Sequence, residues 1–272
     1  HQGTLYVGFT SQNAEPDPRV MVVSSSDGGI HWSNPVVAAE PTGIDVDELY
    51  QDNALPVVAP DGTAYLFFSE WKSEDSPEGP TSIRLAKSTD GGASWHPQPD
   101  VATNLISPGK FRLKNDEIGW PGGATFGVFG TSYPTAAITS DGTLYVAWTD
   151  FPNGSCVFPG KCVNADVRLA VSSNGGASWS APVKVSDDAG TSDQFNPWMV
   201  ARADGTVSLS WADRRLDPNN VNYDVFYTQT TDGAEFLQSV RVSSASSLVG
   251  TSRYASEYSG LATTANGVLS VW

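Results

Sequence analysis

Three segments of this 272-residue chain are almost identical: Ser25-Ser-Asp-Gly-Gly-Ile-His-Trp32, Ser88-Thr-Asp-Gly-Gly-Ala-Ser-Trp95 and Ser172-Ser-Asn-Gly-Gly-Ala-Ser-Trp179. A fourth, Thr230-Thr-Asp-Gly-Ala-Glu-Phe236, is one residue shorter. Each lies between two runs with strand character, so it predicts a hairpin turn. The glycines permit backbone angles closed to other residues, and the Asp or Asn oxygen can accept hydrogen bonds from turn amides. We expect the three tryptophans to occupy equivalent places beside their turns.

A second unit alternates with these turns and carries Asp-Gly between two β-rich runs, which is a hairpin signal. Its clearest copies are Val57-Val-Ala-Pro-Asp-Gly-Thr-Ala-Tyr-Leu-Phe-Phe68, Ala136-Ala-Ile-Thr-Ser-Asp-Gly-Thr-Leu-Tyr-Val-Ala-Trp148 and Met199-Val-Ala-Arg-Ala-Asp-Gly-Thr-Val-Ser-Leu-Ser-Trp211. The two units together form a four-stranded module. Whole modules span about 51–102, 131–187 and 194–244, and partial modules span about 1–40 and 257–272. The repeat predicts one all-β domain over residues 1–272, a β-propeller of five to six four-stranded antiparallel blades.

The two ends of the repeat do not match. The module at residues 1–40 lacks its inner strand, and the module at 257–272 lacks its outer two strands. Closure could pair the C-terminal strands with residues 1–40. We favour the other interpretation, a propeller truncated at both ends, because Trp272 ends the chain within a strand.

The composition excludes several classes of partner. The chain carries 30 acidic and 15 basic residues, a formal net charge of −15. Such a surface does not neutralise a phosphate backbone or an anionic bilayer, so we expect no nucleic-acid partner and no membrane insertion. No apolar run approaches the roughly 20 residues that span a membrane.

The two cysteines, Cys156 and Cys162, lie in one loop. A bond between them would close a short ring and contribute about 2 kcal/mol. A metal site is the alternative, but none of the three histidines is near this loop in sequence. We therefore favour a disulfide and an exported, extracellular or cell-surface protein.

The repeated turns resemble the Asp boxes, or BNR repeats, of sialidases and their relatives, and the resemblance covers nearly the whole chain. It implies a sialidase-like β-propeller. Sialidases, xyloglucanases, sortilin-type receptors and photosystem assembly factors all carry such boxes, so the motif is specific for the fold and poor for function. In those families the boxes lie away from the substrate face. The resemblance thus implies a structural role for Asp27, Asp90, Asn174 and Asp232.

Sialidases use an arginine triad for the substrate carboxylate, an Asp acid/base and a Tyr nucleophile activated by a Glu. The positions here that resemble these groups are Asp17, Tyr258, Arg214 and Arg253. Asp17 is the acid/base candidate, and its alternative is a solvated loop carboxylate between two prolines. Tyr258 is the nucleophile candidate, and its alternative is a packed aromatic at the rim.

The fourth inner strand departs from the sialidase pattern. Phe195-Asn-Pro197 stands where sialidases have Asn-Glu-Pro, so the activating Glu matches Asn196. An amide cannot act as a general base, and by sequence proximity only Asp193 and Glu257 could substitute for it. We therefore expect little or no hydrolysis of sialosides.

One loop offers oxygen ligands for a structural calcium ion: Asp217, Asn219, Asn220 and Asp224. Calcium takes six to eight oxygens, and the run matches no EF-hand. Ordinary hydrogen bonding in an Asx-rich loop is the alternative. No other cofactor is indicated.

Together these features favour a secreted sialidase-like propeller that acts on or recognises an extracellular glycan or glycoprotein, as an exo-sialidase-type glycoside hydrolase if it is catalytic. The alternatives are a non-catalytic propeller that binds glycans or proteins, and a structural surface or filament module.

Overall fold

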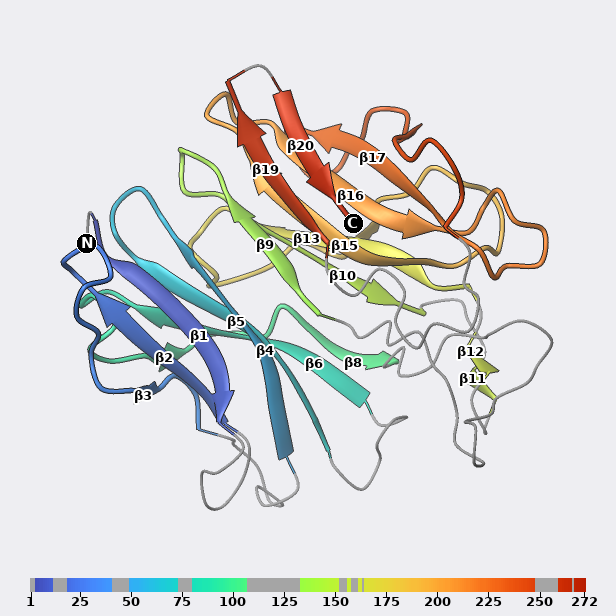
Figure 1. Ribbon diagram of the computed structural model, residues 1–272. Helices are drawn as coiled ribbons and strands as arrows, with labels where there is room; N and C mark the ends of the chain where they lie inside the picture. The colour runs from blue at the N-terminus through green and yellow to red at the C-terminus, as the bar shows by residue number, and fades with distance from the viewer. Residues whose placement is uncertain are drawn as a thin grey trace.

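The computed structural model of the chain is built from antiparallel β-sheets (Figure 1). It describes residues 3–11, 19–40, 49–72, 80–106, 133–151, 156–157, 161–162, 164–247, 259–265 and 267–272. No helix in this part of the chain could span a membrane. The all-β class predicted from the sequence is confirmed.

The described strands form four sheets and two hairpins. The first sheet has β1 (Leu5–Ser11), β2 (Arg19–Ser25) and β3 (Val36–Val37); the second has β4 (Leu49–Val58), β5 (Ala64–Lys72), β6 (Pro80–Ser88) and β7 (His96–Pro97), with β8 (Ala102–Ile106) paired to β6. The third has β9 (Thr135–Ile138), β10 (Leu144–Asp150), β13 (Asp166–Ser172) and β14 (Val183–Lys184); the fourth has β15 (Gln194–Ala201), β16 (Val207–Asp213), β17 (Asp224–Thr230) and β18 (Val240–Arg241). The hairpins are β11 (Cys156–Val157) with β12 (Lys161–Cys162), and β19 (Gly260–Thr264) with β20 (Gly267–Val271).

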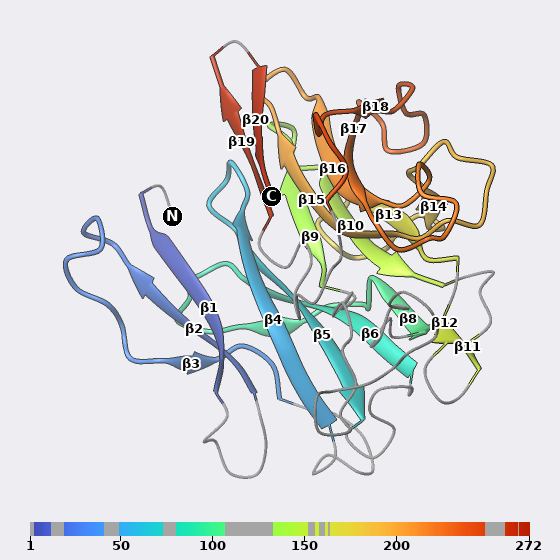
Figure 2. The same cartoon turned by 45° about the vertical axis from the view of Figure 1, so that its right-hand side comes forward.

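The sheets follow one another around a common centre (Figure 2). Strand β4 packs against β1 and β9, β9 packs against β15, and β15 packs against β19. We call β4, β9, β15 and β19 the inner strands. This arrangement is a β-propeller, in which each sheet is one blade.

The core lies between successive sheets, because the second strand of each central sheet is buried on both faces. In β5, Leu66 and Phe68 pack toward the first sheet, whereas Tyr65 and Phe67 pack toward the third. Strands buried on both faces consist of continuous apolar residues rather than an alternating pattern. The run Leu144–Trp148 after one Asp-Gly hairpin is wholly apolar for this reason, whereas the equivalent run in β16 includes the buried Ser208 and Ser210.

The four repeated turns have one hydrogen-bond pattern, which is clearest in the first. The Ser25 hydroxyl donates to Asp27 Oδ1 and accepts the Gly29 N–H, both at 2.9 Å. Asp27 Oδ1 also accepts the His31 N–H at 2.9 Å. Asp90, Asn174 and Asp232 accept the equivalent bonds in the other three turns. The predicted turn, with its carboxylate or amide as acceptor, is confirmed.

The tryptophans of these turns do not all have the same surroundings. Trp95 packs edge-on against Tyr6 of the preceding sheet at 6.3 Å, and Trp179 packs in the same way against Phe67 at 6.0 Å between ring centroids. Trp32 is 43% exposed, because no described sheet precedes the first one. The prediction of equivalent places is right for Trp95 and Trp179 and wrong for the surroundings of Trp32.

The same difference extends over one face of β1. Leu5, Val7 and Phe9 are 37–46% exposed. Their equivalents in β5, β10 and β16 are at most 2% exposed: Ala64, Leu66, Phe68, Leu144, Val146, Trp148, Val207, Leu209 and Trp211. The first sheet therefore presents to solvent an apolar face that is a sheet–sheet interface elsewhere in the molecule.

Candidate functional site

The candidate site lies at the edge of the sheets where the inner strands β4 and β15 begin, which we call the leading edge. The Asp-Gly hairpins and the four repeated turns lie at the opposite edge, which we call the turn edge. Gln51 of β4 is paired with Glu70 and Gln194 of β15 with Asp213. Both inner strands then form a β-bulge, and each bulge has an asparagine at positive φ.

These asparagines are Asn53 (φ 64°) and Asn196 (φ 50°). The strand register shifts at each of them. Bulges of this kind bend a strand, redirect a side chain and are frequent beside functional sites. Asn tolerates left-handed backbone angles better than most residues other than Gly. Asn196 therefore suits the local backbone better than Glu would.

The carboxylates at the ends of the second strands bind neighbouring groups at this edge. Glu70 accepts a hydrogen bond from Gln51 Nε2 at 2.9 Å and pairs with Arg84 at 3.0 Å. Asp213 pairs with Arg215 at 2.7 Å and also accepts the Arg215 backbone N–H. These contacts join each second strand to the strands or loop beside it.

Arg214 lies inside the protein. Its side chain is 0% exposed, and its guanidinium binds the equally buried Asp193 at 3.1 Å. Asp193 also accepts bonds from the Ala165 N–H and the Asn220 side-chain amide. Burial raises the pKa of Asp193, an effect that Arg214 opposes. In this structure Arg214 has no exposed surface with which to hold a substrate carboxylate, and its role in substrate binding stays a prediction.

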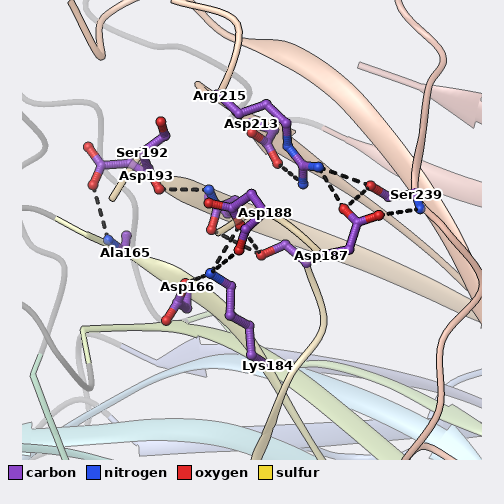
Figure 3. A network of polar contacts seen from close by, with 12 residues as sticks. Ala165, Asp166, Lys184, Asp187, Asp188, Ser192, Asp193, Asp213, Arg215 and Ser239 are labelled. Atoms are coloured by element: carbon purple, nitrogen blue, oxygen red, sulfur yellow. Dashed lines mark hydrogen bonds and ion pairs between the residues drawn. The ribbon is translucent and has the colours of Figure 1, made fainter. Parts of the chain in front are cut away.

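A second group of charges joins the third and fourth sheets (Figure 3). Arg215 lies between Asp213 and Asp187, at 2.7 and 2.6 Å. Asp187 also accepts the backbone N–H of Ser239. Although partial burial opposes its charge, bonds from Ser239 and Arg215 lower the pKa of Asp187 to about 2. Lys184 is held in a similar way by Asp166 and Asp188, at 2.9 and 3.0 Å.

Five described arginines on this side of the sheets share one property: each is ion-paired with a carboxylate of the protein. They are Arg19, Arg84, Arg214, Arg215 and Arg241. Arg168, the equivalent of Arg84 on β13, instead donates to the Pro182 carbonyl at 3.3 Å.

The proposed calcium ligands have separate partners. Asp217 accepts backbone bonds from its own loop, including the Asn219 N–H at 2.9 Å. Asn220 exchanges two bonds with Asp193. Asp224 accepts bonds from one arginine and two serine side chains. No group of three or more His, Cys, Asp or Glu among the described residues could hold a metal ion. The calcium site stays a prediction, and these contacts fit the alternative of Asx-rich loop bonding.

Two exposed aromatic residues lie on or beside the inner strands. Trp198 on β15 is 36% exposed, and Tyr133, two residues before β9, is 37% exposed. A bond of 3.2 Å from the Met199 N–H to the Thr135 hydroxyl joins the two strands beside these residues. Aromatic faces of this kind can stack on the apolar face of a sugar ring. Neither residue stands out in the sequence, since no motif marks an exposed aromatic.

Three catalytic candidates, Asp17, Tyr258 and Arg253, lie outside the described residues, as does Glu257. The predicted role of each therefore stays a prediction. The backbones of Cys156 and Cys162 are direct partners in the register of β11 and β12. Their side chains lie outside the described part of the structure, and the disulfide also stays a prediction.

No protein-family model matches the chain, and no curated protein matches it in sequence. Several solved structures resemble it in backbone fold. A Hadza microbial sialidase is 14% identical with a TM-score of 0.55, over 95% of this chain and 45% of its own. The α-L-arabinanase of Penicillium chrysogenum, solved with arabinobiose, is 15% identical with a TM-score of 0.61, over 98% of this chain and 71% of its own. A PL25 ulvan lyase is 15% identical with a TM-score of 0.50, over 89% and 53%.

The chain thus spans less than half the length of the sialidase and about half that of the lyase. Because every identity is below 25%, these likenesses concern the backbone. They show that the chain has the sialidase-like β-propeller fold.

Proposed function

We propose that this chain is an extracellular Asp-box propeller that recognises glycans through its leading edge without exo-sialidase activity. Three observations support the proposal. Its structural neighbours include two glycosidases and a polysaccharide lyase. Four turns share the bonds of the Ser25–Asp27–Gly29 turn, as expected of Asp boxes. Trp198 and Tyr133 supply exposed aromatic surface at the inner strands.

The burial of Arg214 is the observation that favours recognition over hydrolysis. A sialidase-type site needs converging guanidinium groups that remain open to a carboxylate. Here Arg214 is 0% exposed and bound to Asp193. Removing it from that pair would leave a buried charge uncompensated, so the pair would not open readily for a ligand.

The position of Asn196 supports the same conclusion. A tyrosine nucleophile has an unperturbed pKa near 10 and needs a base to remove its proton. Asn196 is an amide and cannot do this. Catalysis would have to depend on Asp17, Tyr258 and Arg253 with another carboxylate, and this remains the exo-sialidase alternative.

Two measurements test the proposal. Isothermal titration with sialyllactose and with arabinobiose should show binding of at least one sugar, and Trp198→Ala should weaken it roughly tenfold, a loss of about 1.4 kcal/mol. The matched control is Leu237→Ala, which removes an exposed apolar side chain at the turn edge and should leave binding unchanged. Hydrolysis of a fluorogenic sialoside at an ordinary enzyme rate, on the order of 1–10³ s⁻¹, would overturn the non-catalytic proposal.

A further inference from the structure

A polar groove of about 600 Å³ lies at the turn edge, between the repeated turns of the first and second sheets. Ser24, Asp27 and Trp32 line it from the first sheet, and Asp90 lines it from the second. This groove is separate from the leading edge. A ligand bound in it is therefore independent of glycan recognition at that edge.

The repeat shows what occupies the same place at the next interface. Ser24 is paired with Tyr6 across β1 and β2, and Lys87 is paired with Tyr65 across β5 and β6. This register makes them equivalent, and each lies beside the glycine pair of the following turn, Ser24 at its second glycine and Lys87 at its first. A Cβ atom on Gly92 would lie 3.5 Å from Ser24 Oγ, and one on Gly175 would lie 3.6 Å from Lys87 Nζ. Ser24 and Lys87 are therefore equivalent residues at successive interfaces.

The two interfaces differ in charge. At the second, the Lys87 ammonium lies 5.5 Å from the centroid of the Tyr65 ring, and the neighbouring turn has the neutral Asn174. At the first, Ser24 supplies no charge and the two turns carry the carboxylates Asp27 and Asp90, whereas the two turns at the second carry Asp90 and the neutral Asn174. The first interface thus has negative charge and open volume where the second has an ammonium group.

Both carboxylates stay ionised at neutral pH. The His31 backbone N–H lowers the pKa of Asp27 to about 2, and the Ser94 hydroxyl does the same for Asp90. Asp27 also bonds the His31 ring at 2.7 Å. Asp90 accepts three bonds, from the Ser94 N–H and the hydroxyls of Ser94 and Ser88. A carboxylate has about four acceptor sites, which leaves Asp90 capacity for one more donor.

We propose that this groove binds a primary ammonium group, of the kind carried by a lysine side chain or an amino sugar. The ammonium takes the place that Lys87 Nζ holds at the next interface. Asp90 supplies the charge, and the half-exposed ring of Trp32 supplies an aromatic wall for a cation–π contact. The Ser24 hydroxyl supplies a further acceptor at the groove wall.

The test is a titration of ¹⁵N-labelled protein with n-butylammonium, followed at the indole N–H of Trp32, which bonds Gly29 O. A saturable shift at Trp32, absent with n-butanol, is expected. Two further comparisons show whether the ammonium comes from an amino sugar or from a lysine side chain. The first titrates glucosamine and its neutral form N-acetylglucosamine, and the second titrates Nα-acetyl-lysinamide and its neutral ε-acetylated form. No shift with any free ammonium, or an equal shift with the neutral partners, overturns the proposal.

The equivalent positions in the other sheets suggest two variants that test the proposal. Asp90→Asn removes the charge, and Asn174 shows that the turn keeps its bonds with an amide. Asp90→Asn should therefore weaken butylammonium binding roughly tenfold. Ser24→Lys places an internal ammonium in the groove, as at position 87, and should abolish binding. Asp204→Asn, which removes an exposed carboxylate from the turn edge of the fourth sheet, is the control and should change affinity less than about threefold. Full binding by folded Asp90→Asn overturns the proposal, even if Ser24→Lys fails to fold.

Discussion

The Arg214 guanidinium lies 3.1 Å from the Asp193 carboxylate, and neither side chain has any exposed surface. The pair joins the start of β15 to the loop after β16. It lies 21 residues apart in sequence and is surrounded by further bonds to Asp193 from Ala165 and Asn220. Burial therefore determines how much this pair contributes to the free energy of unfolding.

Removing one partner of this pair should be costly. Asp193→Asn leaves the Arg214 charge buried and should lower the free energy of unfolding by about 3–5 kcal/mol. The exposed pair Arg202–Asp204, at 3.7 Å, is the matched control. Arg202→Ala should cost less than about 1 kcal/mol. Urea denaturation measures both, and equal effects would contradict the role given to burial.

The acid sensitivity of the charge network in Figure 3 can be tested at Asp187. Its folded-state pKa of about 2 lies below the unfolded value of about 3.9. The stabilisation is thus present above about pH 4 and is lost as the pH falls toward 2. The difference in Tm between the wild type and Asp187→Asn should shrink over this range. A difference that stays constant from pH 5 to pH 2 would show that Asp187 does not titrate in this way.

Leu5 and Leu144 occupy equivalent positions but differ in exposure, at 45% and 0%. Leu144→Ala creates a cavity between two sheets and should cost about 2–5 kcal/mol. Leu5→Ala removes partly solvated surface and should cost less than about 1 kcal/mol. Thermal unfolding of the two variants measures both losses of stability. Equal losses would mean that the outer face of β1 is covered in solution.

The backbone at Asn196 should resist the residue that sialidases have there. At φ 50°, Asn196→Glu introduces a residue that tolerates left-handed backbone angles less well than Asn and should cost about 1–2 kcal/mol. Asn196→Gly should be close to neutral, because glycine adopts positive φ freely. Neither variant should acquire sialoside hydrolysis. If Asn196→Glu is as stable as the wild type and cleaves a fluorogenic sialoside, the assignment of the fourth inner strand is wrong.

The facing backbones of Cys156 and Cys162 lead to a chemical test. We expect a disulfide, so mass spectrometry after alkylation without reductant should find no modified thiol. Reduction should lower stability by about 2 kcal/mol. Two alkylated cysteines in the native, unreduced protein would refute the bond.

Sequence alone determined the propeller because the turns that define it are local. The contacts of Ser25 with Asp27 and Gly29 lie within five residues, so all the residues that form the turn belong to one short segment. The Asp-Gly hairpins are local in the same sense. Their repetition predicted the β-propeller fold without any knowledge of which sheets touch.

Only the tertiary structure decided the roles of the charged and aromatic side chains. Arg214 and Arg215 are neighbours in sequence, yet one is enclosed with Asp193 and the other binds Asp213 and Asp187 near the surface. Trp32 and Trp95 have the same motif around them, and of the two only Trp95 packs against another sheet among the described residues. Partners and exposure depend on how whole sheets pack, which involves residues far apart in the chain, and no short motif encodes them.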